Sequence, residues 1–321
     1  GVVEGYGACP LCEGAGLASD GEEGEDDAAA QSGRPNFEVV AEAVASGLPA
    51  VADWAGAGGA CSVRPASNSA GAGLFADEAL APGDLIWAEA PLVTVLGTEA
   101  IRQLVVEERA ALGGGTAEMR QINELYARDE RLTCAVARAL EGLEQERQDA
   151  FLSLANSFPA ASALQFDVDV ADTLVQGVCS NVLTSRSQGA LGGIFLTNAV
   201  SEKGEDISHV YALTSRINHS CWPNAVVVQR DKARYVLAAQ PISAGEEVCI
   251  SYVEDYCHAT HAQLQASLGE VAKAVSLDPA VLLVGLFRQQ LFVKWGFWCR
   301  CRRCAPVAED ADEALWNWEQ L

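Results

Sequence analysis

The chain has 321 residues, half of them hydrophobic, which is enough for one large domain or two small ones with a sizeable core. Its 44 acidic residues against 21 basic ones give a formal net charge of −23, which disfavours direct binding to the phosphates of nucleic acids. The same charge would attract a basic protein partner, although solubility alone explains it more simply. No run of about 18 apolar residues is present, so we expect no membrane span and no membrane partner.

The eleven cysteines are grouped rather than spread along the chain. Two form a pair at Cys9 and Cys12, and three fall within six positions at Cys299, Cys301 and Cys304. Such tight spacing suits a metal ion better than disulfides between distant loops, and it indicates a reducing compartment, the nucleus or the cytoplasm. The first pair is half of a zinc site at best, because no second CxxC or CxxH lies within the usual reach.

A poorly ordered start precedes a β-rich region. Residues 1–36 include an acidic run at residues 22–27 and bury too little apolar surface to offset the entropy of ordering. The chain begins at Gly1 without a signal-peptide pattern, so we expect a fragment or a trimmed chain. A short helix is predicted over residues 37–47. A turn is predicted at residues 81–84, and strands are predicted at residues 61–64, 85–89 and 92–96.

Helical periodicity replaces the strand pattern over residues 98–157. Apolar residues there follow four successive helix faces, residues 113–115 are all glycine, and Thr98 and Thr116 are candidate N-caps. We predict a structural helical insert. Residues 165–256 should then return to short strands and loops, with a possible helical start at residues 174–181. Strands are predicted at residues 233–239 and 248–252, a turn at residues 243–246, and two further helices over residues 259–292.

The cluster Cys299, Cys301 and Cys304 leaves a closed zinc site one ligand short, because a structural zinc ion takes four ligands. Cys221 is the candidate for the fourth, since it lies in the second dense polar motif, NHSCWPN at residues 218–224. Zinc bound in this way would tie the C-terminal segment to the loop of Asn218. The alternative is three unligated thiols packed in a reduced core.

Four motifs together resemble those of the SET-domain protein methyltransferases. NHSCWPN at residues 218–224 resembles the family's NHSCxPN motif, and GEEVCISY at residues 245–252 resembles its GEE…SY segment. FWCRCRRC at residues 297–304 resembles its post-SET zinc segment, and GAGLFA at residues 71–76 resembles its N-terminal glycine element. The order also matches, and the pattern is most similar to the SET-and-MYND branch. The MYND finger of that branch is absent here, because residues 98–157 contain only Cys134.

The resemblance implies an α+β fold in which small β-sheets surround a pseudoknot formed by the segments of Asn218 and Tyr252. It places the SET domain at residues 58–256, with the helical insert at residues 98–157. The segments expected after it are a second helical insert at residues 257–292, a zinc-binding post-SET segment at residues 293–305 and an acidic tail at residues 306–321.

The resemblance also implies methyl transfer from S-adenosylmethionine to a lysine of a protein substrate, a histone or another basic protein. A free lysine has a pKa of about 10.4, so an apolar channel is needed to desolvate the amine and yield a nucleophile. Positioning supplies most of the remaining catalysis. Tyr252 matches the active-site tyrosine that holds the methyl group through weak C–H···O contacts, although the residue alone would also fit an ordinary strand tyrosine.

Asn218 and His219 match the family's cofactor-binding pair, although His219 could instead be a buried structural histidine or a zinc ligand. Loss of the metal is expected to lower activity without affecting Tyr252. The expected cofactor-binding residues are Gly71, Ala72, Gly73, Leu74, Asn181, Asn218, His219, Tyr252 and Phe297. The expected zinc ligands are Cys221, Cys299, Cys301 and Cys304.

Three positions depart from the family pattern. Ala70 stands where a basic residue often precedes the glycine element. Leu183 and Trp295 are expected to line the lysine channel. Relatives often carry an aromatic residue at the position of Leu183 and a tyrosine at the position of Trp295. The degree of methylation therefore stays open. So do two alternatives: a non-histone substrate, such as a ribosomal or chloroplast protein, and a weak or inactive SET module that acts as a protein-interaction domain.

Overall fold

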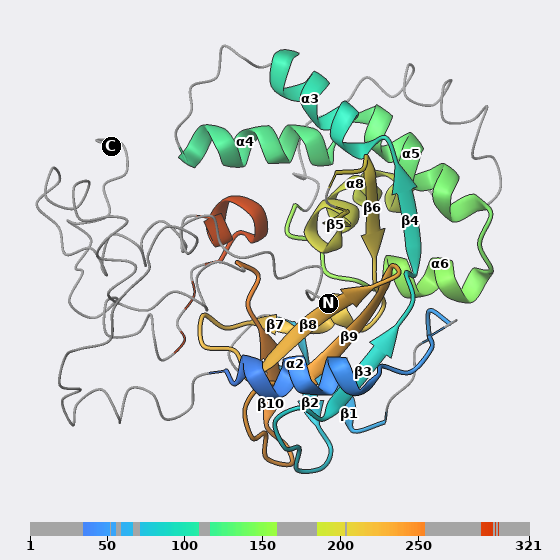
Figure 1. Ribbon diagram of the computed structural model, residues 1–321. Coiled ribbons are helices and arrows are strands. Elements are labelled where there is room, and N and C mark those ends of the chain that lie inside the picture. The colour runs from blue at the N-terminus through green and yellow to red at the C-terminus, as the bar shows by residue number, and fades with distance from the viewer. Residues whose placement is uncertain are drawn as a thin grey trace, which may run out of the picture.

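The computed structural model describes residues 35–51, 53–55, 59–66, 71–108, 116–158, 185–202, 204–253 and 290–297, together with Cys299 and Cys301. These ranges form an α+β fold of three small sheets beside a helical layer (Figure 1). Their helices are α2 (Phe37–Ser46), α3 (Thr98–Glu108), α4 (Thr116–Ala127), α5 (Glu130–Glu141), α6 (Gln145–Leu152), α8 (Ser185–Asn198) and the 3-10 helix η1 (Thr214–Arg216). Their strands are β1 (Cys61–Pro65), β2 (Ala72–Ala76), β3 (Leu85–Glu89), β4 (Val93–Leu96), β5 (Val200–Ser201), β6 (Ile207–Val210), β7 (Asn218–His219), β8 (Ala225–Arg230), β9 (Ala233–Ala238) and β10 (Glu247–Ile250).

The first sheet, with the order β1-β2-β10-β7, brings distant motifs together. Strand β10 pairs antiparallel with β2, where Val248 stands opposite Leu74. On its other side β10 runs parallel to β7, with Cys249 opposite Asn218 and Ile250 opposite His219. A parallel pair needs a long crossover, which the β8–β9 hairpin and its flanking loops provide. The prediction that the Asn218 and Tyr252 segments lie together is therefore confirmed.

The second sheet, with the order β3-β9-β8, is covered on one side by α2 (Figure 1). The side chain of Val40 in α2 is buried against Val228 and Tyr235 of this sheet. Asn36 caps the helix, because its Oδ1 accepts a hydrogen bond from the Val39 N–H at 3.2 Å. Residue 36 had been assigned to the poorly ordered start. The cap and the hydrogen bond from its own N–H to the Ala239 carbonyl, 2.7 Å long, make it part of the fold.

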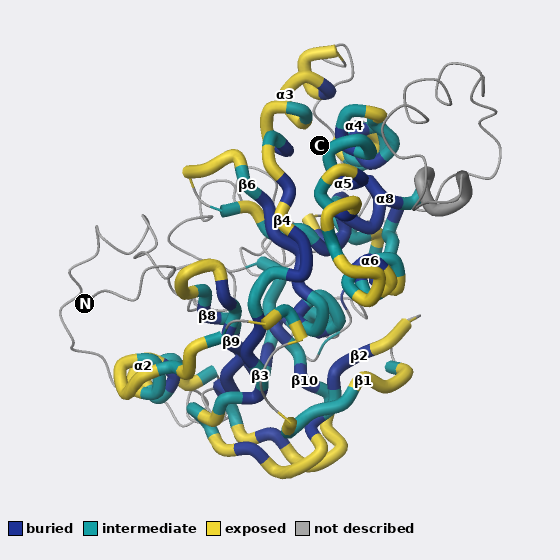
Figure 2. Tube along the Cα trace, turned by 90° about the vertical axis from the view of Figure 1, so that its right-hand side faces the viewer, coloured by how far each residue is buried: buried dark blue, intermediate teal, exposed yellow. Residues whose placement is uncertain are grey.

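The third sheet, with the order β4-β6-β5, packs against the helical layer. The largest core cluster lies between them and includes Leu92 and Val95 from the strand side, Leu132 and Leu140 from α5, and Phe195 from α8. Figure 2 shows the buried positions continuing through the strands and the inner helix faces, whereas the outer faces are exposed. Within the described ranges, no helix is both long enough and apolar enough to cross a membrane.

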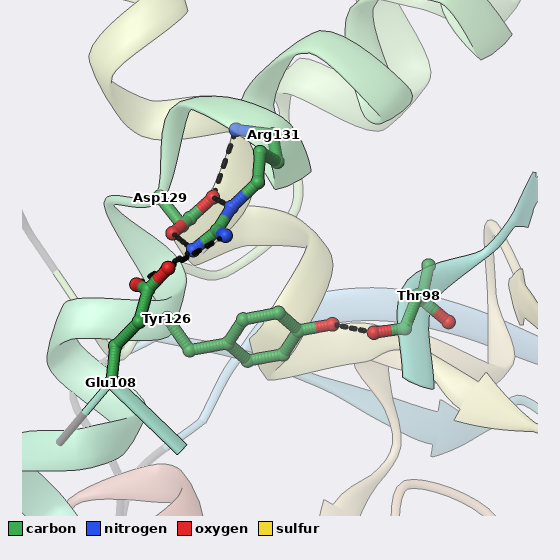
Figure 3. Close-up of polar contacts among 5 residues, drawn as sticks. All are labelled: Thr98, Glu108, Tyr126, Asp129 and Arg131. Atoms are coloured by element: carbon green, nitrogen blue, oxygen red, sulfur yellow. Dashed lines mark hydrogen bonds and ion pairs between the residues drawn. The ribbon is translucent and has the colours of Figure 1, made fainter. Parts of the chain in front are cut away.

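The helical character predicted for residues 98–157 is confirmed: the described part of this range forms four helices, α3 to α6. Figure 3 shows polar contacts that join them. The Tyr126 hydroxyl donates to the Thr98 carbonyl at 2.7 Å, which fixes α4 against the start of α3. The Arg131 guanidinium donates to both carboxylate oxygens of Glu108 at 3.0 Å and also pairs with Asp129, the N-cap of α5.

The prediction that Thr98 caps α3 through its side chain is wrong. Helix α3 begins at Thr98, and the Thr98 hydroxyl contacts Ser208 Oγ at 2.9 Å instead of a helix N–H. The carboxylate of Asp206 accepts hydrogen bonds from the N–H groups of Glu99 at 2.7 Å and Ala100 at 3.2 Å. A residue more than a hundred positions away therefore supplies the cap. The side chain of Thr116, the other candidate, lies outside the described residues.

The loop-and-strand prediction for residues 165–256 is also wrong where α8 spans fourteen residues. This stretch contains Gly189, Gly192 and Gly193, which lower its intrinsic helix preference. The helix is therefore hard to recognise from the sequence. Tertiary packing requires two of these glycines. A Cβ atom on Gly192 would stand 2.1 Å from the Ala127 carbonyl oxygen, and one on Gly193 would stand 2.4 Å from Asn156 Oδ1.

The other local expectations are mostly confirmed. The short helix over residues 37–47 is α2, and the strands expected at residues 61–64, 85–89, 92–96 and 233–239 are β1, β3, β4 and β9. The strand expected at residues 248–252 is β10, which ends two residues earlier at Ile250. The turns at residues 81–84 and 243–246 are present, with positive φ at Gly83 and Gly245. The helical start expected at residues 174–181 lies outside the described residues. So does most of the range 259–292, where two helices were expected, but its last three residues, 290–292, are described and helical.

We expect Gly192→Ala to destabilise the protein by about 1–3 kcal/mol, because the backbone of α4 leaves no room for a methyl group at this position. Gly142→Ala is the matched control, since Gly142 has a φ of −83° and a Cβ there would meet no atom within 4 Å. Urea unfolding of both variants measures the difference. Equal stability of the two would contradict the close packing of α8 on α4.

Candidate active site

A cavity of about 2950 Å³ gathers segments that are far apart in the sequence. Small-molecule sites usually occupy about 300–1,000 Å³, so this one has room for a cofactor and part of a second molecule. Most of the expected site residues line it: Gly71, Ala72, Asn218, His219, Tyr252, Trp295, Phe297, Cys299 and Cys301. The side chain of Leu74 instead is fully buried in the core. Asn181, Leu183 and Cys304 lie outside the described residues.

A buried carboxylate supports the loop that leads to Asn218. Glu89, at the end of β3, is fully buried and accepts hydrogen bonds from the N–H groups of Leu213 at 3.0 Å and Thr214 at 2.6 Å. The Thr214 hydroxyl also donates to it. Burial raises the pKa of Glu89, while these donors act in the opposite direction. Sequence reasoning missed this residue, although an acid at the end of the apolar strand run at residues 85–89 was a visible signal.

Asn218 is oriented by Glu247, the second acid of the GEE segment. Its side-chain amide donates to Glu247 Oε1 at 2.7 Å and to the Ala72 carbonyl at 3.3 Å. A Cβ on Gly73 would stand 2.4 Å from Glu247 Oε1 and 2.9 Å from Asn218 Nδ2, so only glycine leaves space for this pair. At Gly71, by contrast, a Cβ would meet no atom within 4 Å. The chain itself therefore requires Gly73, and Gly71 borders open space in the cavity.

His219 links two parts of the site through its ring. Its Nδ1 accepts a hydrogen bond from the Tyr252 N–H at 3.0 Å, and its Nε2 lies 3.1 Å from Cys221 Sγ. Because Nδ1 accepts, the neutral ring carries its proton on Nε2 and can donate it to the sulfur. Both ring nitrogens thus have partners within the chain. What His219 offers to the cavity is its ring face and its main chain.

Tyr252 stands in an aromatic cluster. Its ring centre lies 4.7 Å from that of Trp295, 5.2 Å from that of His219 and 6.5 Å from that of Phe297. Its hydroxyl donates to the Ile217 carbonyl at 2.6 Å, which fixes the hydroxyl beside the Asn218 loop. Burial raises the pKa of Tyr252, so the hydroxyl keeps its proton at neutral pH and acts as an oriented polar group instead of a base.

The helical insert holds the C-terminal segment that carries Trp295. Residues 290–295 are helical and lie next to α8, where they are drawn in red (Figure 1). The Arg120 guanidinium, from α4, donates to the carbonyls of Phe292 and Val293 at 3.2 Å each, and the Asn123 side chain donates to Val293 at 3.1 Å. The indole N–H of Trp295 donates to the carbonyl of Thr197, the penultimate residue of α8, at 3.0 Å. These bonds set the position of Trp295 against Tyr252.

The thiols of Cys221 and Cys299 are both buried and stand 3.8 Å apart. Two sulfur ligands of a tetrahedral zinc ion, each bonded at about 2.3 Å, are separated by about this distance. The N–H of Cys301 points at Cys299 Sγ over 3.5 Å. Among the described residues, one group of three side chains could hold a metal ion: His219, Cys221 and Cys299, whose ligand atoms all lie within 4.8 Å of one another. The tautomer of His219 favours the two thiols over its imidazole as ligands, because the lone pair of Nδ1 is already occupied.

The comparisons with known proteins agree with this arrangement. The family model for the SET domain matches residues 71–253, more than half of the chain. The histone-lysine N-methyltransferase SET5 of Meyerozyma guilliermondii is 31% identical over 107 residues, which are 32% of this chain and 17% of that protein. A SET and MYND domain-containing protein of Dictyostelium discoideum is 32% identical over 96 residues, 30% of this chain and 21% of that protein. The matched part thus spans about a fifth of these relatives.

Solved SET-domain structures overlap with this chain only loosely. The structure of Rubisco LSMT bound to sinefungin and monomethyllysine covers 82% of this chain and 55% of its own, with 12% identity and a TM-score of 0.34. The structure of the Neurospora SET-domain protein DIM-5, a histone lysine methyltransferase, covers 62% of this chain and 54% of its own, with 15% identity and a TM-score of 0.25. At these scores the likeness carries no argument about function.

We expect Arg120→Met to loosen the segment that carries Trp295, because the variant keeps the aliphatic length but loses the donors to Phe292 and Val293. Hydrogen bonds to a charged donor contribute about 1.5–3 kcal/mol, so amide hydrogen exchange in residues 291–297 should accelerate at least about tenfold. Arg64→Met, which removes a surface ion pair with Asp77, is the control. Unchanged exchange in Arg120→Met would mean that other contacts hold the segment.

Proposed function

The chain belongs to the SET-domain family, and on that premise we propose that it is an S-adenosylmethionine-dependent protein-lysine N-methyltransferase. The observation that carries the proposal is that the segments of Asn218, Tyr252 and Phe297 meet around one cavity. Each of them belongs to a different motif, and nothing local in the sequence would bring the three together. The names of the matched SET5 relatives, which are histone-lysine N-methyltransferases, agree with it.

The cofactor half of the cavity is proposed to lie between the glycine element and Phe297. Gly71 and Ala72 form one wall with open space beside them, and Asn218 and His219 form the floor. Phe297 stands with its ring centre 6.1 Å from that of His219 and offers an aromatic face. When bound, S-adenosylmethionine supplies the methyl group. The carboxylate of Glu247 also lines the cavity, and it favours a cationic ligand such as a sulfonium or an ammonium group.

The lysine half is proposed to lie against Tyr252 and Trp295. Their rings exclude water from an entering amine, which lowers its pKa and increases its neutral, nucleophilic fraction. The Tyr252 hydroxyl, anchored on the Ile217 carbonyl, orients the reacting groups through weak C–H···O contacts. Tyr252 is not the base, because burial raises its pKa. Rate enhancement then comes mainly from positioning and desolvation.

The proposed metal is a structural zinc ion held by Cys221, Cys299, Cys301 and Cys304. The sulfur separation of 3.8 Å and the backbone N–H directed at Cys299 Sγ support it, since zinc-bound thiolates accept such bonds. Its role would be to tie the C-terminal segment to the Asn218 loop. His219 would then stabilise the Cys221 thiolate by donating from Nε2 instead of binding the ion itself.

The proposed substrate is a lysine in a histone or another basic protein, which fits a nuclear or cytoplasmic location and the net charge of −23. The described cavity lining does not share the acidic excess. It contains five basic residues and three acidic ones: Arg216, Arg230, Lys232, Arg234 and Lys294, and Glu202, Asp231 and Glu247. Substrate tests should therefore include lysine peptides with acidic as well as basic flanking residues.

The central test is titration calorimetry of S-adenosylmethionine, followed by radiolabel transfer to core histones and to these peptides. We expect Tyr252→Phe to lower the transfer rate by about 10²-fold and to leave cofactor affinity within about threefold, because a positioned polar group is lost. Tyr235→Phe is the control: it also loses one hydroxyl bond, to the Pro49 carbonyl, but in another part of the core. If a folded, zinc-loaded sample bound no cofactor, the proposed enzymatic function would be contradicted. The remaining alternative would then be a SET module that acts as a protein-interaction domain.

Removal of one proposed zinc ligand should be visible in the metal content. We expect Cys221→Ser to release most of the zinc, measured as metal per chain by mass spectrometry, and to increase hydrogen exchange in residues 291–297. Cys61→Ser is the control, because Cys61 lies in β1 and is not one of the proposed zinc ligands. If Cys221→Ser retained its full zinc content, the fourth ligand would lie elsewhere.

A further inference from the structure

Lys294 brings an amine of the chain itself into the proposed active site. It directly precedes Trp295 on the segment held by Arg120, and it lines the same cavity as Tyr252. Its Nζ lies 4.5 Å from the centre of the Trp295 ring, and that centre lies 4.7 Å from the Tyr252 ring. The Trp295 ring therefore lies close to both the amine and the proposed catalytic tyrosine.

The surroundings of Lys294 are those that a lysine nucleophile needs. Burial, with a smaller contribution from the positive charges of Arg234 and Arg102, lowers the pKa of Lys294 to about 8. About half of its amines are thus neutral near pH 8, whereas an ordinary lysine is almost fully charged there. The contact with the Trp295 ring favours the charged form, but desolvation outweighs it. The side chain is also long and flexible, with four rotatable methylene groups.

Lysine is scarce in this chain, which makes its presence at this position informative. Seventeen of the 21 basic residues are arginine, and the four lysines are Lys203, Lys232, Lys273 and Lys294. Lys203 and Lys273 lie outside the described residues. Lys232 is exposed in the turn between β8 and β9, at the edge of the same cavity. Lys294 thus combines proximity to Tyr252 with a desolvated amine, and Lys232 provides an exposed comparison on the same cavity.

We propose that Lys294 is a self-methylation site of this protein. The neutral Nζ attacks the methyl carbon of bound S-adenosylmethionine, and a nitrogen–carbon bond forms as the carbon–sulfur bond breaks. The sulfur keeps the bonding electron pair and leaves as neutral S-adenosylhomocysteine, and the positive charge passes to Lys294, which becomes a methylated ammonium. The inference rests on the proposed function, because the donor and the site are the same.

The position of Trp295 also suits the product. Methylated ammonium groups remain cationic and bind aromatic faces well, because the charge is spread over methyl groups that lose little hydration. A methylated Lys294 would therefore stay against the Trp295 ring, within the lysine half of the cavity. In that position it competes with an entering substrate lysine, so self-methylation would also slow transfer to other proteins.

Peptide mapping by mass spectrometry tests the proposal on the unmodified sequence, so no variant has to fold for the main result. The zinc-loaded protein is incubated with S-adenosylmethionine carrying a labelled methyl group, and label is quantified at all four lysines. We expect label on Lys294, with a rate per chain that does not change over a tenfold range of protein concentration, because the reaction occurs within one molecule. Lys294→Arg should lose this label, and Lys232→Arg should keep it.

Several outcomes would overturn the inference. They are label on other lysines only, a rate per chain that rises with protein concentration, or transfer to an added lysine peptide without label on Lys294. In the last case the proposed function stands and only self-methylation fails. If the protein neither binds the cofactor nor labels any peptide, the proposed function itself fails, so the two failures are distinguishable.

Discussion

The parallel pairing of β7 with β10 is the contact on which the rest of the site depends. Strand β7 has only two residues, so it is held mainly from outside the sheet. Glu89 supports the preceding turn, and Asn224 bridges to β10 by accepting from the Cys249 N–H and donating to the Glu247 carbonyl, both at 2.8 Å. Tyr252 follows β10 after one residue. Its N–H donates to His219 in β7, and its hydroxyl donates to the carbonyl of Ile217, which directly precedes β7.

The helical insert is more than a structural addition to this core. Arg120 and Asn123, both on α4, bind the main chain of the segment that carries Trp295, and the end of α8 accepts the Trp295 indole N–H. The position of α8 in turn depends on Gly192, which allows its close approach to α4. One wall of the proposed lysine channel is therefore built on the insert. Sequence variation in the insert can reshape the channel without changing any of the four motifs.

Local patterns in the sequence predicted what is locally determined. Strand alternation located β1, β3, β4 and β9, helix periodicity located the insert, and the motifs located Asn218 and Tyr252. The missed features all depend on distant partners. The Asp206 cap of α3, the Glu89 anchor and the Arg120 contacts join residues more than a hundred positions apart. Tertiary packing stabilises α8 although its sequence has a low intrinsic helix propensity. Glu247 was visible in its motif, but only the folded structure shows that Asn218 contacts Glu247, whereas Glu246 contacts Asn224.

His219 changes the expected relation between the proposed metal and the proposed catalytic tyrosine. Loss of zinc was expected to leave Tyr252 untouched. In the structure, one imidazole ring contacts both Cys221 through Nε2 and the Tyr252 main chain through Nδ1. A Cys221 that gains a proton on metal loss accepts a weaker hydrogen bond than a thiolate does, because charge-assisted bonds are the stronger ones. The ring would then be less firmly oriented, and the Tyr252 N–H would lose a fixed acceptor. Hydrogen bonds through His219 therefore connect the proposed zinc ligand Cys221 with Tyr252.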